Sequence, residues 1–449
     1  MIDNFSPPLR SRPSRRSVLM AGLGTALSLP FLSACAGFDT SGATAGEGTV
    51  GFLSTQFTPV EEKQRYEAVL KKFVKVPVAY NSVDPGVFAS TVKSQADAGN
   101  VRTALLGGLH GELAPLAGSL EDVDHLVTDL ADRGFTKDIL DLAKAGGGAT
   151  KYVPWMQATY IVAINKKALE WLPSGVDVND LTYEGYLAWA KAAKKGAGRA
   201  VFGMPAGPKG LHHRFYQGFL LPSFTGGQIT TFRNADAVTA WNYMKDLWDN
   251  MAPASTNYNA MQEPLASGEV LVAWDHVARL VAAPATKPED WLMVPAPRGP
   301  KGRGYMLIVA GLALPKGGKE RVRAEQAIRA LTEPQVQVET LRSNAFFPVV
   351  QTELPTDLSG AIALEAAAVK RQQRSAGALL ALPPVGLGAK EGEVSQIFKN
   401  CFQEICLDGS AVQPVLDRQA TQLNTIMKAL NVPCWAPDPV STGSKCEVA

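Results

Sequence analysis

The stretch of residues 49–80, TVGFLSTQFTPVEEKQRYEAVLKKFVKVPVAY, decides the fold class of this chain. It begins with a short apolar run at 49–53, which is typical of a buried strand. Residues 60–73 then carry apolar side chains at helical spacing, and residues 74–80 predict a second strand. A strand, a helix and a strand within about 30 residues form the unit of a parallel sheet whose faces are covered by helices.

The same alternation continues along the chain. Further helices are predicted at residues 87–98, 111–117, 136–143, 183–194, 236–249, 321–331 and 413–430, and further strands at 103–106, 159–164, 270–273, 291–294 and 306–313. Residues 107–110, GGLH, predict a tight turn. A chain of 449 residues is too long for one hydrophobic core. We therefore expect an α/β protein with two doubly wound lobes.

The first 35 residues predict an export signal with a lipid attachment site. Residues 14–19, SRRSVL, place paired arginines before a short apolar segment, which resembles a twin-arginine signal. Residues 32–35, LSAC, resemble a bacterial lipobox, in which Cys35 would carry lipid. A membrane-spanning helix over residues 18–34 is an alternative, although it is short and contains glycine and proline. Ordinary cleavage at residues 34–36, ACA, is another.

Residues 36–48 are small and polar, and they predict a flexible tether behind Cys35. No later apolar stretch approaches 18 residues, so we expect a membrane contact through lipid only, on the outer face of the cytoplasmic membrane. The net charge of +2, with 19% charged residues, gives no indication of nucleic acid or an acidic polymer as partner.

The other four cysteines all lie in the last 50 residues, at Cys401, Cys406, Cys434 and Cys446. An even number of cysteines in an exported chain favours one or two disulfides, and the pairing stays open. A metal site would require histidines or a C-x-x-C spacing nearby. The five histidines lie far upstream, at His110, His125, His212, His213 and His276. We expect neither a metal nor another cofactor.

Four parts of the sequence resemble, in order, the motifs of one protein family. They are NVRTALL (100–106), YVPWM with IVAINK (152–156 and 161–166), ASGEVLVAW (266–274), and the run of PAPRGP, GLALPKGG and LTEPQVQ (295–300, 311–318 and 331–337). The order is similar to family 1 of the solute-binding proteins of bacterial ABC importers, which includes maltose-binding and other carbohydrate-binding members. Residues 101–103, VRT, depart from the Ala-Pro-Asp of that family.

The resemblance implies a type II periplasmic-binding-protein fold, with two lobes joined by hinge segments and a ligand in the cleft between them. The expected parts are an N-terminal lobe (49–154 with 310–344), a C-terminal lobe (159–304 with 349–430), hinges (154–158, 305–309 and 344–349) and a C-terminal tail (431–449). The resemblance also implies a monomer that delivers a solute to permease and ATPase subunits, and no catalytic residues.

Ligand-binding residues are expected in loops beyond the carboxyl ends of strands. The candidates are Thr55, Gln56, His110, Trp155, Gln157, Trp274, Asp275, Gly304 and Tyr305. Trp155 and Trp274 would stack on a sugar ring, and Asp275 would accept hydrogen bonds from hydroxyl groups. A glycine at 304 would let a ligand approach the backbone. Core packing of the tryptophans, helix capping by Asp275 and a turn role for His110 are the alternatives.

The expected ligand is a small neutral carbohydrate, because the candidate loops hold one acid and few arginines. A glycerophosphodiester, a polyamine or a peptide is an alternative solute. Residues 212–214, HHR, predict a charged helix start rather than a ligand contact. A glycan-active enzyme would need two placed carboxylates, for which Asp275 with Glu263 or Glu269 are candidates. The sequence contains no zinc-protease, nucleophile-elbow or nucleotide-binding motif.

Overall fold

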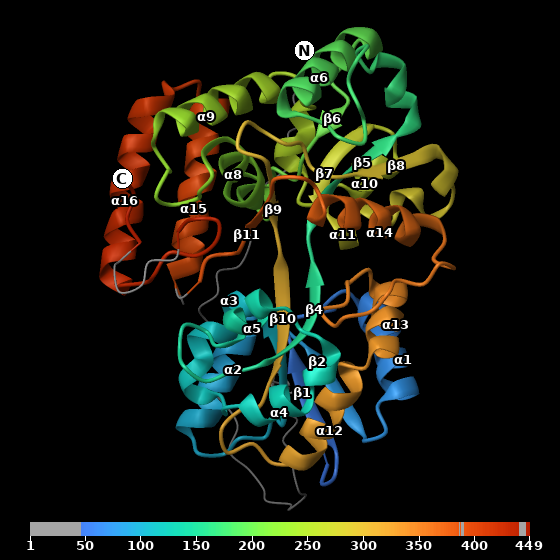
Figure 1. Ribbon diagram of the computed structural model, residues 1–449, viewed down its shortest axis with the longest axis vertical. Coiled ribbons are helices and arrows are strands. Elements are labelled where there is room, and N and C mark those ends of the chain that lie inside the picture. The colour runs from blue at the N-terminus through green and yellow to red at the C-terminus, as the bar shows by residue number, and fades with distance from the viewer. Residues whose placement is uncertain (1–45, 386, 388–389, 440–445) are drawn as a thin grey trace, which may run out of the picture. The chain divides into compact units, whose positions relative to one another are not determined.

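A computed structural model describes residues 46–385, 387, 390–439 and 446–449 (Figure 1). The predicted signal, the lipid attachment at Cys35 and nearly all of the tether lie outside the described residues and stay predictions. Among the described residues, no helix has the length and apolar character needed to cross a membrane.

A mixed five-stranded sheet with the order β2-β1-β3-β10-β4 forms the first lobe. Its strands are β1 (Val50–Ser54), β2 (Val78–Ser82), β3 (Leu105–Leu109), β4 (Val153–Ala158) and β10 (Ile308–Ala313). Strand β1 is parallel to β2 and to β3, whereas β10 is antiparallel to β3 and to β4. The chain therefore returns to the first lobe long after leaving it, and inserts β10 between β3 and β4 (Figure 1).

Helices cover this sheet, and α1 illustrates why they form where they do. Helix α1 buries Tyr66, Val69 and Leu70 on one face, and its acidic first turn and basic last turn suit the helix dipole. The helices of the first lobe are α1 (Val60–Phe73), α2 (Pro85–Asp97), α3 (His110–Leu113), α4 (Asp124–Asp129), α5 (Lys137–Ala143), α12 (Arg321–Leu331) and α13 (Pro334–Asn344).

The second lobe is built on a four-stranded sheet with the order β6-β7-β5-β8. Its strands are β5 (Tyr160–Asn165), β6 (Phe202–Gly203), β7 (Val272–His276) and β8 (Trp291–Val294), and β5 is antiparallel to both β7 and β8. Strands β9 (Arg303–Met306) and β11 (Ala378–Ala381) form a separate parallel pair.

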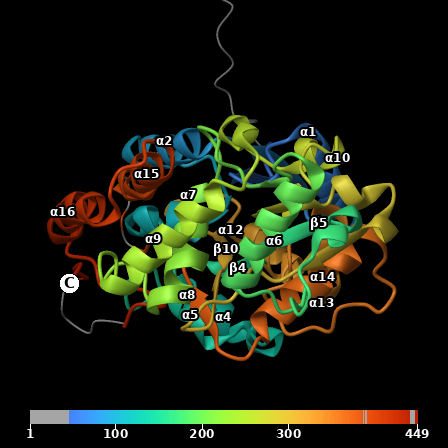
Figure 2. The ribbon, with the colours of Figure 1, turned by 90° about the horizontal axis from the view of Figure 1, so that it is seen from above.

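Nine helices that the structure describes surround these strands: α6 (Tyr183–Ala197), α7 (His212–Phe215), α8 (Leu221–Thr225), α9 (Ala235–Trp248), α10 (Gln262–Ala266), α11 (Val277–Leu280), α14 (Gly360–Gln373), α15 (Glu391–Phe402) and α16 (Val412–Leu430). Viewed from above, α15 and α16 lie together at one side, with α9 beside them (Figure 2). One π-helical turn, η4 (Tyr216–Leu220), continues α7, and another, η9 (Gln403–Leu407), continues α15.

The expected α/β fold with two lobes is confirmed, but both sheets are mixed rather than purely parallel. Helices 60–73 and 321–331 and strand 291–294 have the predicted bounds. The turn predicted at 107–110 is wrong, because Gly107–Leu109 complete β3 and His110 begins α3. Glycine is required at 107 by packing, since a Cβ there would lie 2.7 Å from Phe52 Cε2.

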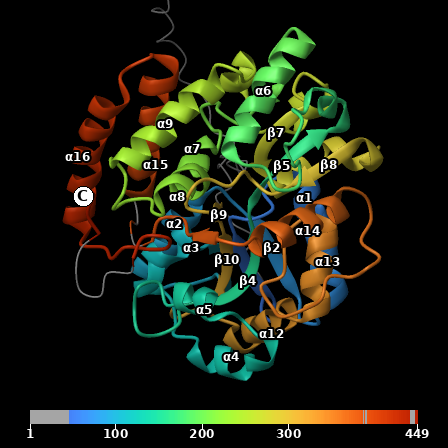
Figure 3. The ribbon, with the colours of Figure 1, turned by 45° about the horizontal axis from the view of Figure 1, so that its top comes forward.

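Three stretches of backbone pass between the lobes and pair with one another. Strand β4 leads into β5, β9 leads into β10, and Ile308 of β10 pairs with Ala158 of β4. On the other side of β4, Gln157 and Phe347 exchange two backbone hydrogen bonds, of 2.9 and 2.7 Å. We call the paired residues around 157, 308 and 347 the crossing ribbon; its strands β4 and β10 lie at the centre of the view in Figure 3.

The C-terminal tail is held against the second lobe by a disulfide and a buried carboxylate. Cys434 is bonded to Cys446, whereas Cys401 and Cys406 are buried thiols, so the described residues contain one of the expected disulfides. Asp438 is 2% exposed. It accepts hydrogen bonds from the backbone N–H groups of residues 228–230, at 2.7, 3.0 and 2.8 Å. This carboxylate therefore fixes a loop that has few other backbone partners.

Replacing Asp438 by alanine should destabilise the protein, because it leaves these N–H groups without an acceptor. We expect Asp438→Ala to lower the free energy of unfolding by about 3 kcal/mol. Asp357→Ala is the control, since Asp357 is 73% exposed and pairs only with Arg342 at the surface; it should change stability by less than about 0.5 kcal/mol. Urea unfolding of both variants tests this, and equal midpoints would contradict it.

Candidate functional site

Thr55, Gln56 and a carboxylate that the sequence did not single out lie together beyond the carboxyl ends of β1 and β3. Thr55 Oγ1 donates to Glu112 Oε2 at 2.5 Å, and the N–H of Leu109 donates to the same oxygen at 2.7 Å. Gln56 Nε2 donates to Thr55 Oγ1 at 2.8 Å. Burial raises the pKa of Glu112 to about 6, although these hydrogen bonds and the charge of Arg214 act to lower it. Two of the predicted residues thus orient a partly buried carboxyl group.

His110 is a buried neutral side chain at the start of α3. It is 1% exposed, and its Nδ1 lies 2.8 Å from the hydroxyl of Tyr152. Burial lowers the pKa of His110 to about 4, so the imidazole is uncharged at neutral pH. Among the described residues its Nε2 has no hydrogen-bond partner. The contact with Tyr152 favours the structural alternative for this residue.

Trp155 packs among the buried side chains of the first lobe, which favours the alternative of core packing over stacking on a sugar. The side chain is 1% exposed. Its ring centroid lies 5.6 Å from that of Phe52, 6.0 Å from that of Phe57 and 5.5 Å from that of Tyr66. Strand β4 therefore turns this side chain toward α1, because burying the large ring there removes more apolar surface from water than a cleft wall would.

Trp274 also lies within an aromatic cluster, in the second lobe. It is 2% exposed and stacks on Tyr160, with ring centroids 4.6 Å apart and an interplanar angle of 8°. The rings of Phe215 and Phe219 meet it edge-on at 5.1 and 5.2 Å. The cluster leaves no open face of the indole for a sugar, although its Nε1 has no partner among the described residues.

The carboxylate of Asp275 holds the backbone of its own lobe, which favours a structural role over the predicted hydrogen bonds to a ligand. It is fully buried, with Oδ2 accepting from the N–H of Met261 at 2.8 Å and Oδ1 from that of His276 at 2.7 Å. Burial raises its pKa to about 6. The cap of α11 is His276, whose Nδ1 accepts from the N–H of Ala278. An enclosed carboxyl of this kind does not suit the paired acids of a glycosidase.

The remaining predicted residues lie near the crossing ribbon. Gln157 Nε2 donates to the carbonyl of Pro348 at 2.5 Å, so this side chain reinforces the ribbon. A Cβ at Gly304 would lie 2.8 Å from the carbonyl oxygen of Phe219, so glycine is required by the protein's own backbone rather than by a ligand. Tyr305 is partly buried, and burial raises the pKa of its hydroxyl.

Charged side chains of the two lobes face one another, and most of them were missed in the sequence. Arg214 of α7 donates through Nη2 to Glu391 Oε1 of α15 at 2.7 Å. The charges of Arg214 and Glu391 both act on the pKa of Glu112 in the other lobe. In the same way, the charge of Arg279 in α11 lowers the pKa of Glu62 in α1, although burial raises it overall. Acids of the first lobe thus lie opposite arginines of the second.

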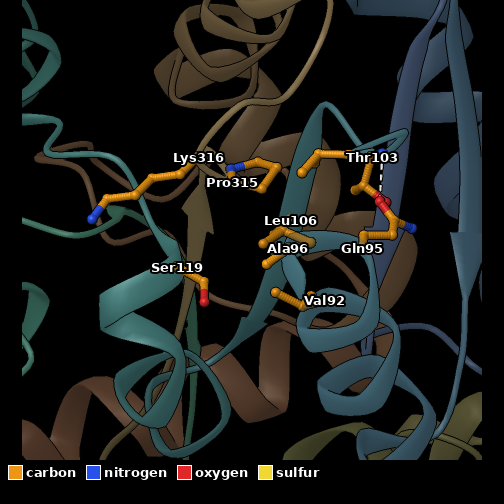
Figure 4. A pocket seen from close by; sticks show the side chains of 9 residues that line it. Val92, Gln95, Ala96, Thr103, Leu106, Ser119, Pro315 and Lys316 are labelled. Carbon is orange, nitrogen blue, oxygen red and sulfur yellow. Dashed lines mark hydrogen bonds between the residues drawn. The ribbon is translucent and has the colours of Figure 1, made fainter. Parts of the chain in front are cut away.

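A small pocket elsewhere in the first lobe does not suit a solute. It lies between α2 and the segment that follows β10, and has a volume of about 10 Å³, which is room for about one water molecule (Figure 4). Thr103, which precedes β3, lines it, so the pocket lies at the opposite end of the sheet from Thr55 and Glu112. No group of three or more metal-ligating side chains is present among the described residues.

Comparison with known proteins identifies the family. A sequence profile of the bacterial extracellular solute-binding proteins matches residues 58–338, more than half of the chain. The chain belongs to this family. The family is one of binding proteins, and its description as extracellular makes this an exported protein. No curated protein sequence matches the chain.

Solved structures of similar fold come from several bacteria. The GacH receptor of Streptomyces glaucescens, solved unliganded and with acarbose, shares 19% identity and matches over 85% of this chain and 98% of its own, with a TM-score of 0.67. UgpB of Mycobacterium tuberculosis, in complex with glycerophosphocholine, shares 17% identity over 86% of this chain and 100% of its own, with a TM-score of 0.67.

An ABC transporter solute-binding protein of Thermotoga lettingae, bound to α-D-tagatose, is similar in the same way. It shares 16% identity over 84% of this chain and 99% of its own, with a TM-score of 0.66. These similarities establish a type II periplasmic-binding-protein fold. The three proteins bind different ligands, so the fold leaves the ligand of this chain open.

The raised pKa of Glu112 predicts a pH-dependent effect of its charge on stability. Because the folded protein holds this proton more tightly than the unfolded chain does, its contribution to stability is full below pH 4.5 and is lost as the pH rises through about 6. Glu112→Gln resembles the protonated form. We expect it to stabilise the protein by about 1 to 2 kcal/mol at pH 8 and by much less at pH 4. Urea unfolding at both pH values measures this, and an equal effect at both would contradict it.

Proposed function

We propose that this protein is an exported lipoprotein that captures a small carbohydrate between its two lobes and delivers it to an ABC importer. The match to the solute-binding family over residues 58–338 is the observation that carries the proposal. Lobes whose backbones are linked through the crossing ribbon support a hinge that closes around a ligand. Within the proposal, the hinges are residues 154–158, 305–309 and 344–349.

The polar groups on the two lobes fit a polyhydroxylated ligand. Hydroxyl groups both donate and accept hydrogen bonds, so a carboxylate on one side and a guanidinium on the other can engage the same sugar. Glu112, oriented by Thr55, supplies the acceptor, and Arg214 supplies the donor. These residues replace Trp155, Trp274 and Asp275 as the proposed ligand contacts, and Gln56 supports Thr55.

The anchor and the partners complete the proposal. Cys35 would carry the lipid on the outer face of the cytoplasmic membrane, and the tether of residues 36–48 would span roughly 20 Å as a random coil. The protein would act as a monomer that presents solute to a permease and its ATPase, without a cofactor and without catalysis. The enclosed position of Asp275 supports the absence of a glycosidase site.

A glycerophosphodiester is the second candidate ligand. A guanidinium binds phosphate oxygens in a bidentate manner. Arg214 is favoured for this because its charge acts on Glu112 in the other lobe. A sugar is favoured, because Arg214 already donates a hydrogen bond through Nη2 to Glu391 and has fewer N–H groups left for a phosphate.

A thermal-shift screen of the mature chain against mono- and disaccharides, with glycerophosphocholine as the competing ligand, tests the function. A sugar present at 100 times its Kd should stabilise the protein by about 2.7 kcal/mol by mass action. Calorimetry should then give one site, and chromatography should find no product. If glycerophosphocholine raises the thermal midpoint and no sugar does, the ligand is a glycerophosphodiester rather than a sugar. Turnover of an oligosaccharide would contradict a binding protein.

A further inference from the structure

Glu391 is the first residue of α15, a helix of the second lobe. This helix packs against α7 and α16. The carboxylate of Glu391 accepts a hydrogen bond from Arg214 Nη2 at 2.7 Å. The side chain of Glu391 is 24% exposed and that of Arg214 is 14% exposed. A partly buried, charge-assisted hydrogen bond of this length holds the arginine in one orientation.

The second oxygen of Glu391 reaches the other lobe. A Cβ built on Gly111 would lie 2.5 Å from Glu391 Oε2, so the carboxylate rests directly on the backbone of α3. Helix α3 follows β3 and carries Glu112 one residue further on. One side chain of the second lobe therefore contacts an arginine of its own lobe and the backbone of the first.

We propose that Glu391 is a positioning residue that ties the two lobes together, fixing Arg214 at the cleft and limiting how far the cleft opens. This inference rests on the proposed function, because a binding protein must open and close around its solute. The tie involves none of the residues of the crossing ribbon, so it is a second connection between the lobes.

The charges near this contact explain why the Arg214–Glu391 pair affects the opening of the cleft. Glu112 and Glu391 repel each other across the lobes, and Arg214 offsets this through its charge near Glu112 and its hydrogen bond to Glu391. On α7, burial lowers the pKa of His212 and His213, which stay neutral at neutral pH. Removing the arginine would leave two carboxylates facing each other, which favours an open cleft.

The test measures the distance between the lobes without a ligand. Spin labels are placed by Lys93→Cys on α2 and Asn242→Cys on α9, both exposed, while the buried thiols Cys401 and Cys406 stay unlabelled. Pulsed electron paramagnetic resonance then gives the distance distribution. In the Glu391→Ala variant we expect a longer and broader distribution than in the parent.

Glu393→Ala is the matched control, because Glu393 lies in the same first turn of α15 but is 54% exposed and pairs with Lys390. It should leave the distances unchanged. If Glu391→Ala does not fold, Glu391→Gln removes the charge with little change of shape and is measured in the same way. A lower thermal midpoint with unchanged distances would mean that Glu391 stabilises its own lobe only, and would overturn the proposal.

Neutralising the two charges of the pair in turn gives a second, independent outcome. Arg214→Gln should open the cleft further than Glu391→Gln, because it leaves two like charges, and the double variant should resemble Glu391→Gln alone. Additive effects would overturn the proposed arrangement. Once a ligand is known, Glu391→Ala should weaken its affinity by roughly threefold to tenfold through a smaller closed population. Failure of every solute to bind would remove the proposed function while leaving the distance measurement valid.

Discussion

The pairing of three backbone segments between the lobes is the constraint on which the rest of the structure depends. Gln157 bonds to Phe347 on one side of β4, and Ile308 pairs with Ala158 on the other. Each lobe is therefore assembled from parts of the chain that are distant in sequence. The first sheet is incomplete until β10 is inserted between β3 and β4. The ribbon has few paired residues, so bending it disturbs few hydrogen bonds.

Large aromatic side chains stabilise these cores, and this explains why they are poor ligand platforms here. Trp155 and Trp274 are each surrounded by other rings and almost fully buried. The groups that face from one lobe to the other are charged instead, with Glu112 and Glu62 on the first lobe and Arg214 on the second. Electrostatic attraction at partial burial is stronger than at an open surface, so these side chains favour approach of the lobes.

The sequence predicts local structure better than it predicts the site. Helix 60–73 was predicted with its bounds because its apolar spacing is regular and its ends carry matching charges. Helices α13 and α14 were not predicted, because their apolar spacing is weaker, and α15 was missed although its apolar spacing is regular. Glu112 and Glu391 come from helices in different lobes, and only the folded chain brings them to the same place. The orientation of Trp155 depends on which face of β4 is covered by α1, and the sequence does not specify this.

Closure of the two lobes around a solute is tested most directly by small-angle X-ray scattering. The mature protein is measured alone and then saturated with the ligand that stabilises it best. We expect the radius of gyration to fall on saturation, because the lobes turn about the crossing ribbon while each keeps its own fold. An unchanged radius of gyration at full saturation would contradict a cleft that closes.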